Sequence, residues 1–204
     1  MKRLGTYREI CFDPLFAGPA ISRTLLDAMS RPATPLPLGD IPLVVPPSGL
    51  RPACAVLLAV LDRDVTFHVA DAEAADMRDY LRFNTGAHAA APEDADFVLV
   101  VGPTAGPALD AIVRAGHEPA DDGVRLVYVP DDLDPLDGHD EVVLELDDAE
   151  IYGTRRLTVD GLAAEDFARL HTCRATSRPV DLWFVSPDGR LAAIPRTTRW
   201  RPAR

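Results

Sequence analysis

The sequence predicts an α/β fold in which helices cover both faces of a mixed β-sheet, giving a three-layer α/β/α sandwich. Strand-like and helix-like segments alternate over the first two thirds of the chain. A continuous apolar run at residues 96–101 is typical of a strand buried on both faces. Near the C-terminus, Asp188-Gly189 separates two apolar runs, which indicates a hairpin. The length suits one domain over residues 16–204, after a loose arm over residues 1–15.

Five segments have apolar residues at helical spacing. Pro19 suits the first turn of the first helix, and Pro32 stops the chain from continuing it. The second helix has a wide apolar face, which predicts a central, buried position. The fourth helix ends before Gly116. The predicted helices span residues 19–30, 52–61, 74–83, 107–115 and 164–171.

Six apolar segments are predicted to be strands, and an acidic loop separates the third from the fourth. The proline-rich stretch at residues 31–47 is expected to be an extended connector with room for a short strand around residues 43–45. The predicted strands span residues 65–69, 96–101, 124–129, 142–146, 180–185 and 191–194.

Composition excludes several classes of function. The formal net charge of −11 argues against general binding to nucleic acid or to an anionic membrane, since both need excess positive charge. No apolar window reaches the length of a membrane span, and the start lacks the apolar run of a signal peptide, so we expect a cytoplasmic protein. Cys11, Cys54 and Cys173 are far apart and are expected to be reduced thiols.

Charge is distributed unevenly along the chain. Between Glu118 and Glu150, thirteen acidic residues accompany one basic residue, Arg125. From Arg155 onward, ten arginines accompany five acidic residues. This asymmetry fits either a solvated surface or a face that binds a partner.

No set of residues predicts catalysis. Lys2 is the only lysine, so Schiff-base chemistry is excluded unless the N-terminal segment enters a site. The segment Gly102-Pro103-Thr104-Ala105-Gly106 lies where phosphates often bind, but it lacks the P-loop lysine and spacing and is better interpreted as a tight turn. The five histidines lack metal-ligand spacing, so no metal is expected. No serine has the G-x-S-x-G context, so acyl-transfer chemistry has no support. No cofactor is expected.

Arginines beside hydroxyl groups are the remaining candidates for binding. In Arg196-Thr197-Thr198-Arg199, two guanidinium groups could hold phosphate-type oxygens. They could equally bind a carboxylate on a neighbouring subunit, or fasten the end of the sheet to a helix. Arg82 and Arg63, at predicted helix ends, are further ligand-binding or interface candidates, and Arg82 could face the same pocket or interface as Arg196.

Five segments, in order, carry a resemblance to the PhnH family of the bacterial carbon–phosphorus lyase system. They span about residues 15 to 200. The chain departs from the family at Ala33, where a glycine is usual, and at residues 151–154 and 177–179, where family motifs are reduced. The five segments are residues 25–32, 57–64, 80–87, 180–184 and 191–199.

The resemblance implies a fold similar to that of the pyridoxal-phosphate-dependent aminotransferases but without the cofactor. It also implies a subunit that works with PhnG, PhnI and PhnJ, in a complex that transfers alkylphosphonate to the ribose of ATP with loss of adenine. A homodimer is expected for the isolated protein, and the family has no agreed catalytic residues. The expected role is therefore a non-catalytic or assisting subunit. The alternatives are a subunit that binds phosphate, phosphonate or nucleotide and, less favoured, an enzyme active alone.

Overall fold

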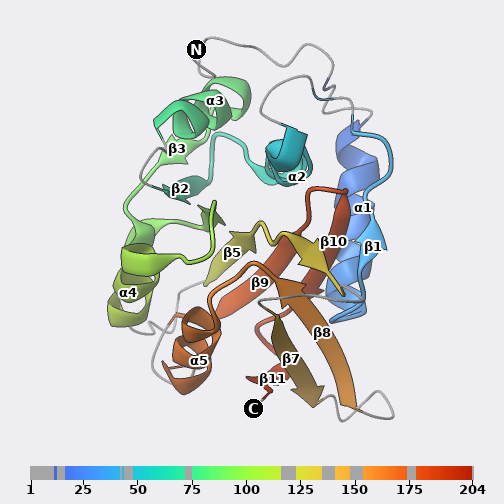
Figure 1. Ribbon diagram of the computed structural model, residues 1–204. Coiled ribbons are helices and arrows are strands. Elements are labelled where there is room, and N and C mark those ends of the chain that lie inside the picture. The colour runs from blue at the N-terminus through green and yellow to red at the C-terminus, as the bar shows by residue number, and fades with distance from the viewer. Residues whose placement is uncertain are drawn as a thin grey trace.

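The computed structural model describes residues 12, 17–41, 43, 48–71, 75–115, 123–134, 141–147, 154–173 and 178–203. In this part, five α-helices accompany two β-sheets (Figure 1). The mixed α/β class predicted from sequence is confirmed. The helices are α1 (Ala17–Ser30), α2 (Arg51–Val60), α3 (Ala75–Thr85), α4 (Gly106–Ala115) and α5 (Ala164–Cys173), with short 3-10 turns η2 (Ser48–Leu50) and η3 (Pro92–Asp94).

The larger sheet has seven strands in the order β1-β10-β9-β5-β4-β2-β3. Strands β3, β2, β4, β5 and β9 are parallel, whereas β10 and β1 run antiparallel to their neighbours, so the sheet is mixed. β9 and β10 form the predicted hairpin. The strands are β1 (Leu36–Pro37), β2 (Thr66–Ala70), β3 (His88–Ala89), β4 (Phe97–Val100), β5 (Val124–Tyr128), β9 (Val180–Val185) and β10 (Arg190–Ile194).

A second, antiparallel sheet has the order β11-β7-β8-β6. The prediction of a single sheet is therefore wrong, because the strand expected at residues 142–146 belongs to this smaller sheet. β8 and β11 were not predicted, since every second residue in them is charged or polar and faces solvent. The strands are β6 (Asp132–Leu133), β7 (Val142–Asp147), β8 (Thr154–Asp160) and β11 (Arg199–Pro202).

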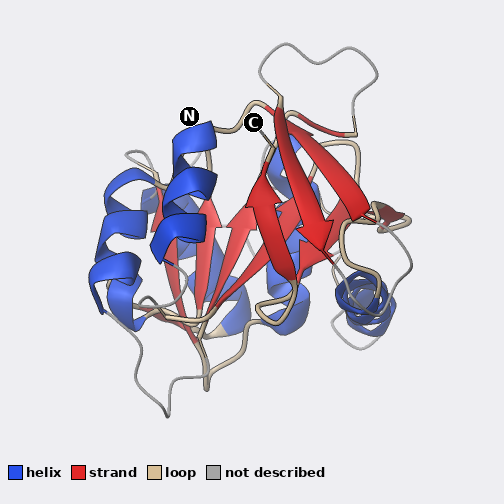
Figure 2. Cartoon of the chain, turned by 90° about the horizontal axis from the view of Figure 1, so that it is seen from below, coloured by secondary structure: helices blue, strands red, loops and turns tan. Residues whose placement is uncertain are grey.

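Apolar cores lie on both faces of the larger sheet. α1, α2 and α3 cover one face and pack against it to form the first core, and the core on the opposite face is the second. α4, α5 and the smaller sheet cover the other, and Figure 2 shows helices on both sides of the strands. β4, β5 and β9 therefore bury nearly all of their side chains, as the apolar run at residues 96–101 predicted.

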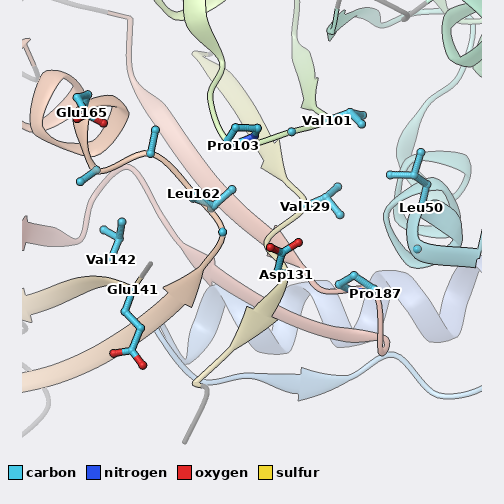
Figure 3. Close-up of a pocket in the computed structure, with 15 residues that line it drawn as sticks. Leu50, Val101, Pro103, Val129, Asp131, Glu141, Val142, Leu162, Glu165 and Pro187 are labelled. Atoms are coloured by element: carbon cyan, nitrogen blue, oxygen red, sulfur yellow. The ribbon is translucent and has the colours of Figure 1, made fainter. Parts of the chain in front are cut away.

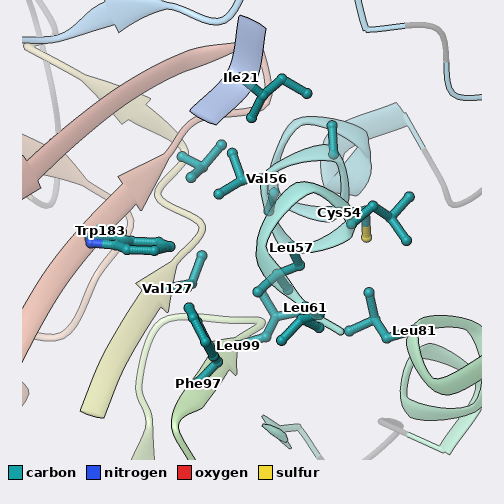
Figure 4. Packing of buried hydrophobic residues seen from close by; sticks show 14 of the residues in the cluster. Ile21, Cys54, Val56, Leu57, Leu61, Leu81, Phe97, Leu99, Val127 and Trp183 are labelled. Carbon is teal, nitrogen blue, oxygen red and sulfur yellow. The ribbon is translucent and has the colours of Figure 1, made fainter. Parts of the chain in front are cut away.

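α2 is the central helix of the first core. Pro52 lies in its first turn, and each residue from Pro52 to Leu58 is buried. Val56 and Leu57 face Val127 and Trp183 on the sheet (Figure 4). The predicted central position of this helix is confirmed. Complete burial here stabilises the fold by about 1.5–3 kcal/mol for each large apolar side chain.

Several predictions fall wholly or partly outside the described residues. These are most of the N-terminal arm, the short strand around residues 43–45, much of the acidic loop, and Lys2. Phe12, in the arm, is buried in the first core, and Leu43 is also buried. In the described part, none of the helices is both long and apolar enough to cross a membrane.

Candidate functional site

An open pocket of about 930 Å³ lies at the carboxyl ends of β4, β5 and β9 (Figure 3). In α/β sheets, ligands usually bind at this edge, where loops from neighbouring strands meet. η2 and the N-terminus of α5 complete its wall. The lining comprises Gly49, Leu50, Val101, Gly102, Pro103, Val129, Asp131, Glu141, Val142, Gly161, Leu162, Ala163, Ala164, Glu165 and Pro187.

The charged groups of this pocket are all carboxylates. Asp131, Glu141 and Glu165 are exposed, and no arginine, lysine or histidine among the described residues lines the pocket. Figure 3 shows Asp131 between Leu162 and Pro187, whereas Glu165 lies apart on α5. Among the described residues, no group of three or more His, Cys, Asp or Glu side chains is placed to hold a metal ion. Carboxylates among apolar walls favour a cationic or neutral group and repel a phosphonate.

Gly161 allows the Asp131 carboxylate to lie against the backbone of the pocket. Gly161 has φ +75°, and an added Cβ would lie 2.6 Å from the Asp131 carboxyl carbon. The backbone N–H of Asp131 donates to the carbonyl of Asp160 at 2.9 Å. Because both the conformation and the close approach require glycine, a side chain at position 161 would displace Asp131.

The turn between β4 and α4 is held by a carboxylate of the chain itself. Asp166 on α5 is 5% exposed, and it accepts hydrogen bonds from the Thr104 hydroxyl and the Ala105 N–H, both at 2.7 Å. It also accepts one from the Tyr128 hydroxyl at 3.0 Å. Asp166 thus provides, at the N-terminus of α4, the negative charge that a bound phosphate would provide. These contacts support the interpretation of residues 102–106 as a tight turn.

Tyr128 lies beneath this carboxylate in the second core, in contact with the rings of Phe167 and Phe184. Burial raises the pKa of the Tyr128 hydroxyl well above its usual value, and the negative charge of Asp166 raises it further. The hydroxyl therefore stays protonated and acts as a donor to Asp166.

Arg196 lies at the opposite edge of the larger sheet. β10 runs antiparallel to β9, so its C-terminal end meets the amino ends of the parallel strands. The Arg196 Nη2 donates to Asp181 Oδ2 at 2.7 Å, and its backbone N–H donates to Asp181 Oδ1, also at 2.7 Å. Asp181, on β9, is 4% exposed. In the described structure, the guanidinium of Arg196 thus binds a carboxylate of its own chain.

Two more arginines complete this edge. Arg125 Nε lies 3.8 Å from Asp181 Oδ2. Arg178 is 9% exposed and donates to the carbonyls of Glu93 and Ala95, at 2.6 and 3.2 Å. Both join the amino ends of neighbouring strands. The fastening at this edge is therefore from strand to strand, whereas the third alternative for Arg196 was a link from the end of the sheet to a helix.

The predicted run divides between the two sheets after Arg196. The Thr198 N–H donates to the Pro195 carbonyl at 2.9 Å, which closes a turn. Thr197 is exposed on this turn. Arg199 begins β11 in the smaller sheet, and its side chain is exposed. The run is therefore a connection between sheets, and its first residue, Arg196, is the one paired with Asp181.

Arg63 and Arg82 lie near β2 and β3, not beside Arg196. The aliphatic part of Arg63 packs on Gly86, where an added Cβ would lie 3.0 Å from its Cγ. Arg82 is exposed, with its Nη2 3.5 Å from Asp79 Oδ1. Three strand spacings separate β2 from β9, roughly 14 Å. None of the predicted candidates lines the pocket at the carboxyl edge.

A second hollow, of about 980 Å³, lies on the smaller sheet and contains charged residues that the sequence analysis did not single out. Arg201 donates to Glu145 Oε2 at 2.9 Å, and Arg156 donates to Oε1 at 2.8 Å. These bonds, first that from Arg201, lower the pKa of Glu145. The sequence signal was the alternation of charged and apolar residues in β7, β8 and β11.

Asp181 and Asp166 were also not among the site residues predicted from the sequence. A single acidic residue inside the apolar run 180–185 was a usable signal, because a buried charge requires a partner. Asp166 gave no such signal, since an acidic residue in the first turn of a helix usually faces solvent and stabilises the helix dipole.

Comparison with known proteins identifies the family. No curated protein matches the chain. The family model described as bacterial phosphonate metabolism protein (PhnH) matches residues 12–201, which includes nearly every described element of both sheets. The resemblance noted from the five sequence segments is thereby confirmed. The chain belongs to the PhnH family of bacterial phosphonate metabolism proteins.

Proposed function

We propose that this protein is a subunit of the carbon–phosphorus lyase complex and has no catalytic activity of its own. It would assist the transfer of alkylphosphonate to the ribose C1 of ATP, with release of adenine, in company with PhnG, PhnI and PhnJ. Membership of the PhnH family is the observation that carries this proposal. The reaction would take place in the cytoplasm.

The electrostatics of the described residues support an assisting role. Phosphonate and triphosphate groups carry several negative charges and need clustered donors or cations. At the carboxyl edge of the larger sheet, the pocket offers carboxylates instead. The N-terminus of α4 is occupied by Asp166, and Arg196 binds Asp181. These three places are therefore either acidic or already occupied by a carboxylate of the chain.

We further propose that the two helical layers and the larger sheet correspond to the three-layer fold of pyridoxal-phosphate-dependent transferases without the cofactor. The location of the only lysine at position 2 supports this part of the proposal, because the cofactor is held through an internal lysine in that chemistry.

Co-purification tests the proposed function. A tagged chain expressed with PhnG, PhnI and PhnJ should retain these subunits, and its deletion should abolish growth on methylphosphonate. The purified chain alone should neither release adenine from ATP nor cleave methylphosphonate. Failure to retain any of the three subunits, together with normal growth of the deletion strain, would refute the proposal.

The exposed side chains of Thr197 and Arg199 favour a second candidate function, a subunit that holds phosphate, phosphonate or nucleotide for its partners. Thermal shift with ATP, ribose phosphates and methylphosphonate tests this candidate. Arg199→Gln is a better probe than Arg196→Ala, since loss of the Arg196 side chain would leave the buried Asp181 without its main partner. No ligand-dependent shift in the native protein would eliminate this candidate.

The isolated protein is also proposed to be a homodimer, as the family resemblance implies. Sedimentation velocity over a range of protein concentrations tests this, and a single species with the mass of one chain throughout would contradict it.

A further inference from the structure

The smaller sheet has a solvent-facing surface that is rich in arginine. In β11, Trp200 is 8% exposed and faces the second core, so Arg199 and Arg201 on either side of it face solvent. In β7 and β8, the buried Leu144, Leu146 and Leu157 likewise turn Glu145 and Arg156 outward. We call this surface, defined by Glu145, Arg156, Arg199 and Arg201, the arginine face.

Strand register places its charged groups side by side. Arg201 lies directly opposite Glu145, and Glu145 lies directly opposite Arg156. Directly opposed Cβ atoms in antiparallel strands are about 4.5–5.5 Å apart, so the two guanidinium groups reach the same carboxylate from both sides. Glu145 therefore holds both arginines in place over the hollow of about 980 Å³.

Glu145 does not saturate these arginines. Arg201 donates to it through Nε and Nη2, and Arg156 through Nη2, whereas each guanidinium has five N–H groups. The Arg156 side chain remains 69% exposed, and the Arg201 side chain remains 70% exposed. Among the described residues that line the hollow, Arg156 and Arg201 accompany one carboxylate, that of Glu145, although the chain as a whole has a formal net charge of −11. Farther along the same face, the strand register places Asp147 opposite Arg199, and Asp160 follows Arg156 on the outer side of β8. The excess of positive charge is thus local to the hollow.

The dimensions of the face favour an extended acidic segment over a single oxyanion. The arginines are distributed from β11 to β8, across two strand spacings or about 10 Å. One oxyanion at such an open site gains little, because water and salt screen each exposed charge pair. Several carboxylates on one chain can engage the arginines together, and Val143 and Pro202 at the edge of the hollow offer apolar contact.

We propose that the arginine face docks an acidic segment of a partner subunit in the carbon–phosphorus lyase complex. This inference rests on the proposed function, since it names the surface through which a non-catalytic subunit would attach. The preorganised arginines provide the charge complementarity, and Glu145 keeps them oriented before the partner arrives.

The first measurement uses a fluorescent oligoglutamate peptide as the probe. We expect salt-sensitive binding to the native protein, weakened about threefold by Arg199→Gln and about tenfold or more by Arg156→Gln/Arg201→Gln. The double variant Arg31→Gln/Arg78→Gln is the matched control, because it removes two half-exposed arginines that lie beside aspartates on α1 and α3. Absence of peptide binding to the native protein, or an equal loss in the control, would overturn the inference.

The second measurement is co-purification of the same variants with the partner subunits. We expect Arg156→Gln/Arg201→Gln to reduce retention at least about tenfold relative to the control variant. Arg199→Gln guards against a folding artefact, since the Arg199 side chain is exposed. Equal retention of native and variant chains would overturn the docking role of the arginine face and leave the proposed function intact. Failure of the native chain to retain any subunit would overturn the proposed function itself.

Discussion

The two sheets use arginine in different ways. In the larger sheet, Arg196 and Asp181 form a largely buried pair, with Asp181 4% exposed. In the smaller sheet, Arg156 and Arg201 share Glu145 but remain mostly exposed. A buried pair leaves an uncompensated charge when one partner is removed, whereas water compensates an exposed pair. The difference shows that the first group holds two strands of the fold together, whereas the second remains exposed to solvent, as the proposed docking requires.

The largest expected effect comes from Asp181→Asn. It would remove the carboxylate that the Arg196 and Arg125 guanidinium groups share at the amino edge of the larger sheet. We expect a loss of about 3 kcal/mol in the free energy of unfolding, measured by urea denaturation. A loss no greater than that of Glu145→Gln would contradict the distinction between the two sheets.

Asp166→Asn ranks second. An amide in place of the carboxylate cannot accept from Thr104, Ala105 and Tyr128 together without presenting an N–H group to one of these donors. We expect a loss of about 2 kcal/mol in unfolding free energy. Glu165→Gln is the control, since this neighbour on α5 is exposed and should change stability by less than about 0.5 kcal/mol.

Tyr128→Phe should cost about 1 kcal/mol, because Asp166 keeps its two other donors. It also tests the raised pKa of Tyr128. A raised folded-state pKa adds stability that is fully present below the unfolded value of about 10 and is lost as pH rises through the folded value. Native protein should therefore lose stability at alkaline pH more steeply than the variant, in urea denaturation at a series of pH values. Parallel pH profiles would contradict this prediction.

Glu145→Gln should have the smallest effect on stability and the greatest sensitivity to salt. The lowered pKa of Glu145 means that its contribution is present above the unfolded pKa and disappears as pH falls through the folded pKa. Thermal unfolding at neutral and acidic pH, at low and high salt, measures this contribution. A difference in thermal stability between native and variant chains that grows toward acidic pH would contradict the lowered pKa of Glu145.

Most of the larger sheet and all five helices could be predicted from the sequence. Burial on both faces gives continuous apolar runs, and helices packed on one side give apolar residues at helical spacing, so both patterns are local. The helix predicted at residues 52–61 and the hairpin around Asp188-Gly189 correspond to α2 and to β9 and β10. The strands that were not predicted include β8 and β11, whose outer side chains are charged or polar.

The candidate residues were less predictable than the fold. Arg196 and Arg199 are close along the chain and were therefore predicted to act together, but the turn at Thr197 and Thr198 separates them, and Arg199 begins a strand of the smaller sheet. Their charged neighbours come from strands far away in sequence: Asp181 for Arg196, and for Arg199 the arginine face that includes Glu145 and Arg156. Pairing of distant strands has no local signal, so spacing alone could not reveal these partners.

By itself, the sequence determined the α/β class, the positions of most elements, the family resemblance and the absence of an internal lysine. These properties depend on residue type and local periodicity. Tertiary structure alone decided that Arg196 binds Asp181, that Asp166 occupies the N-terminus of α4, and that Arg156, Arg199 and Arg201 share a solvent-facing surface. Each of these depends on which strands and helices become neighbours, and burial of apolar faces across the whole chain sets those contacts.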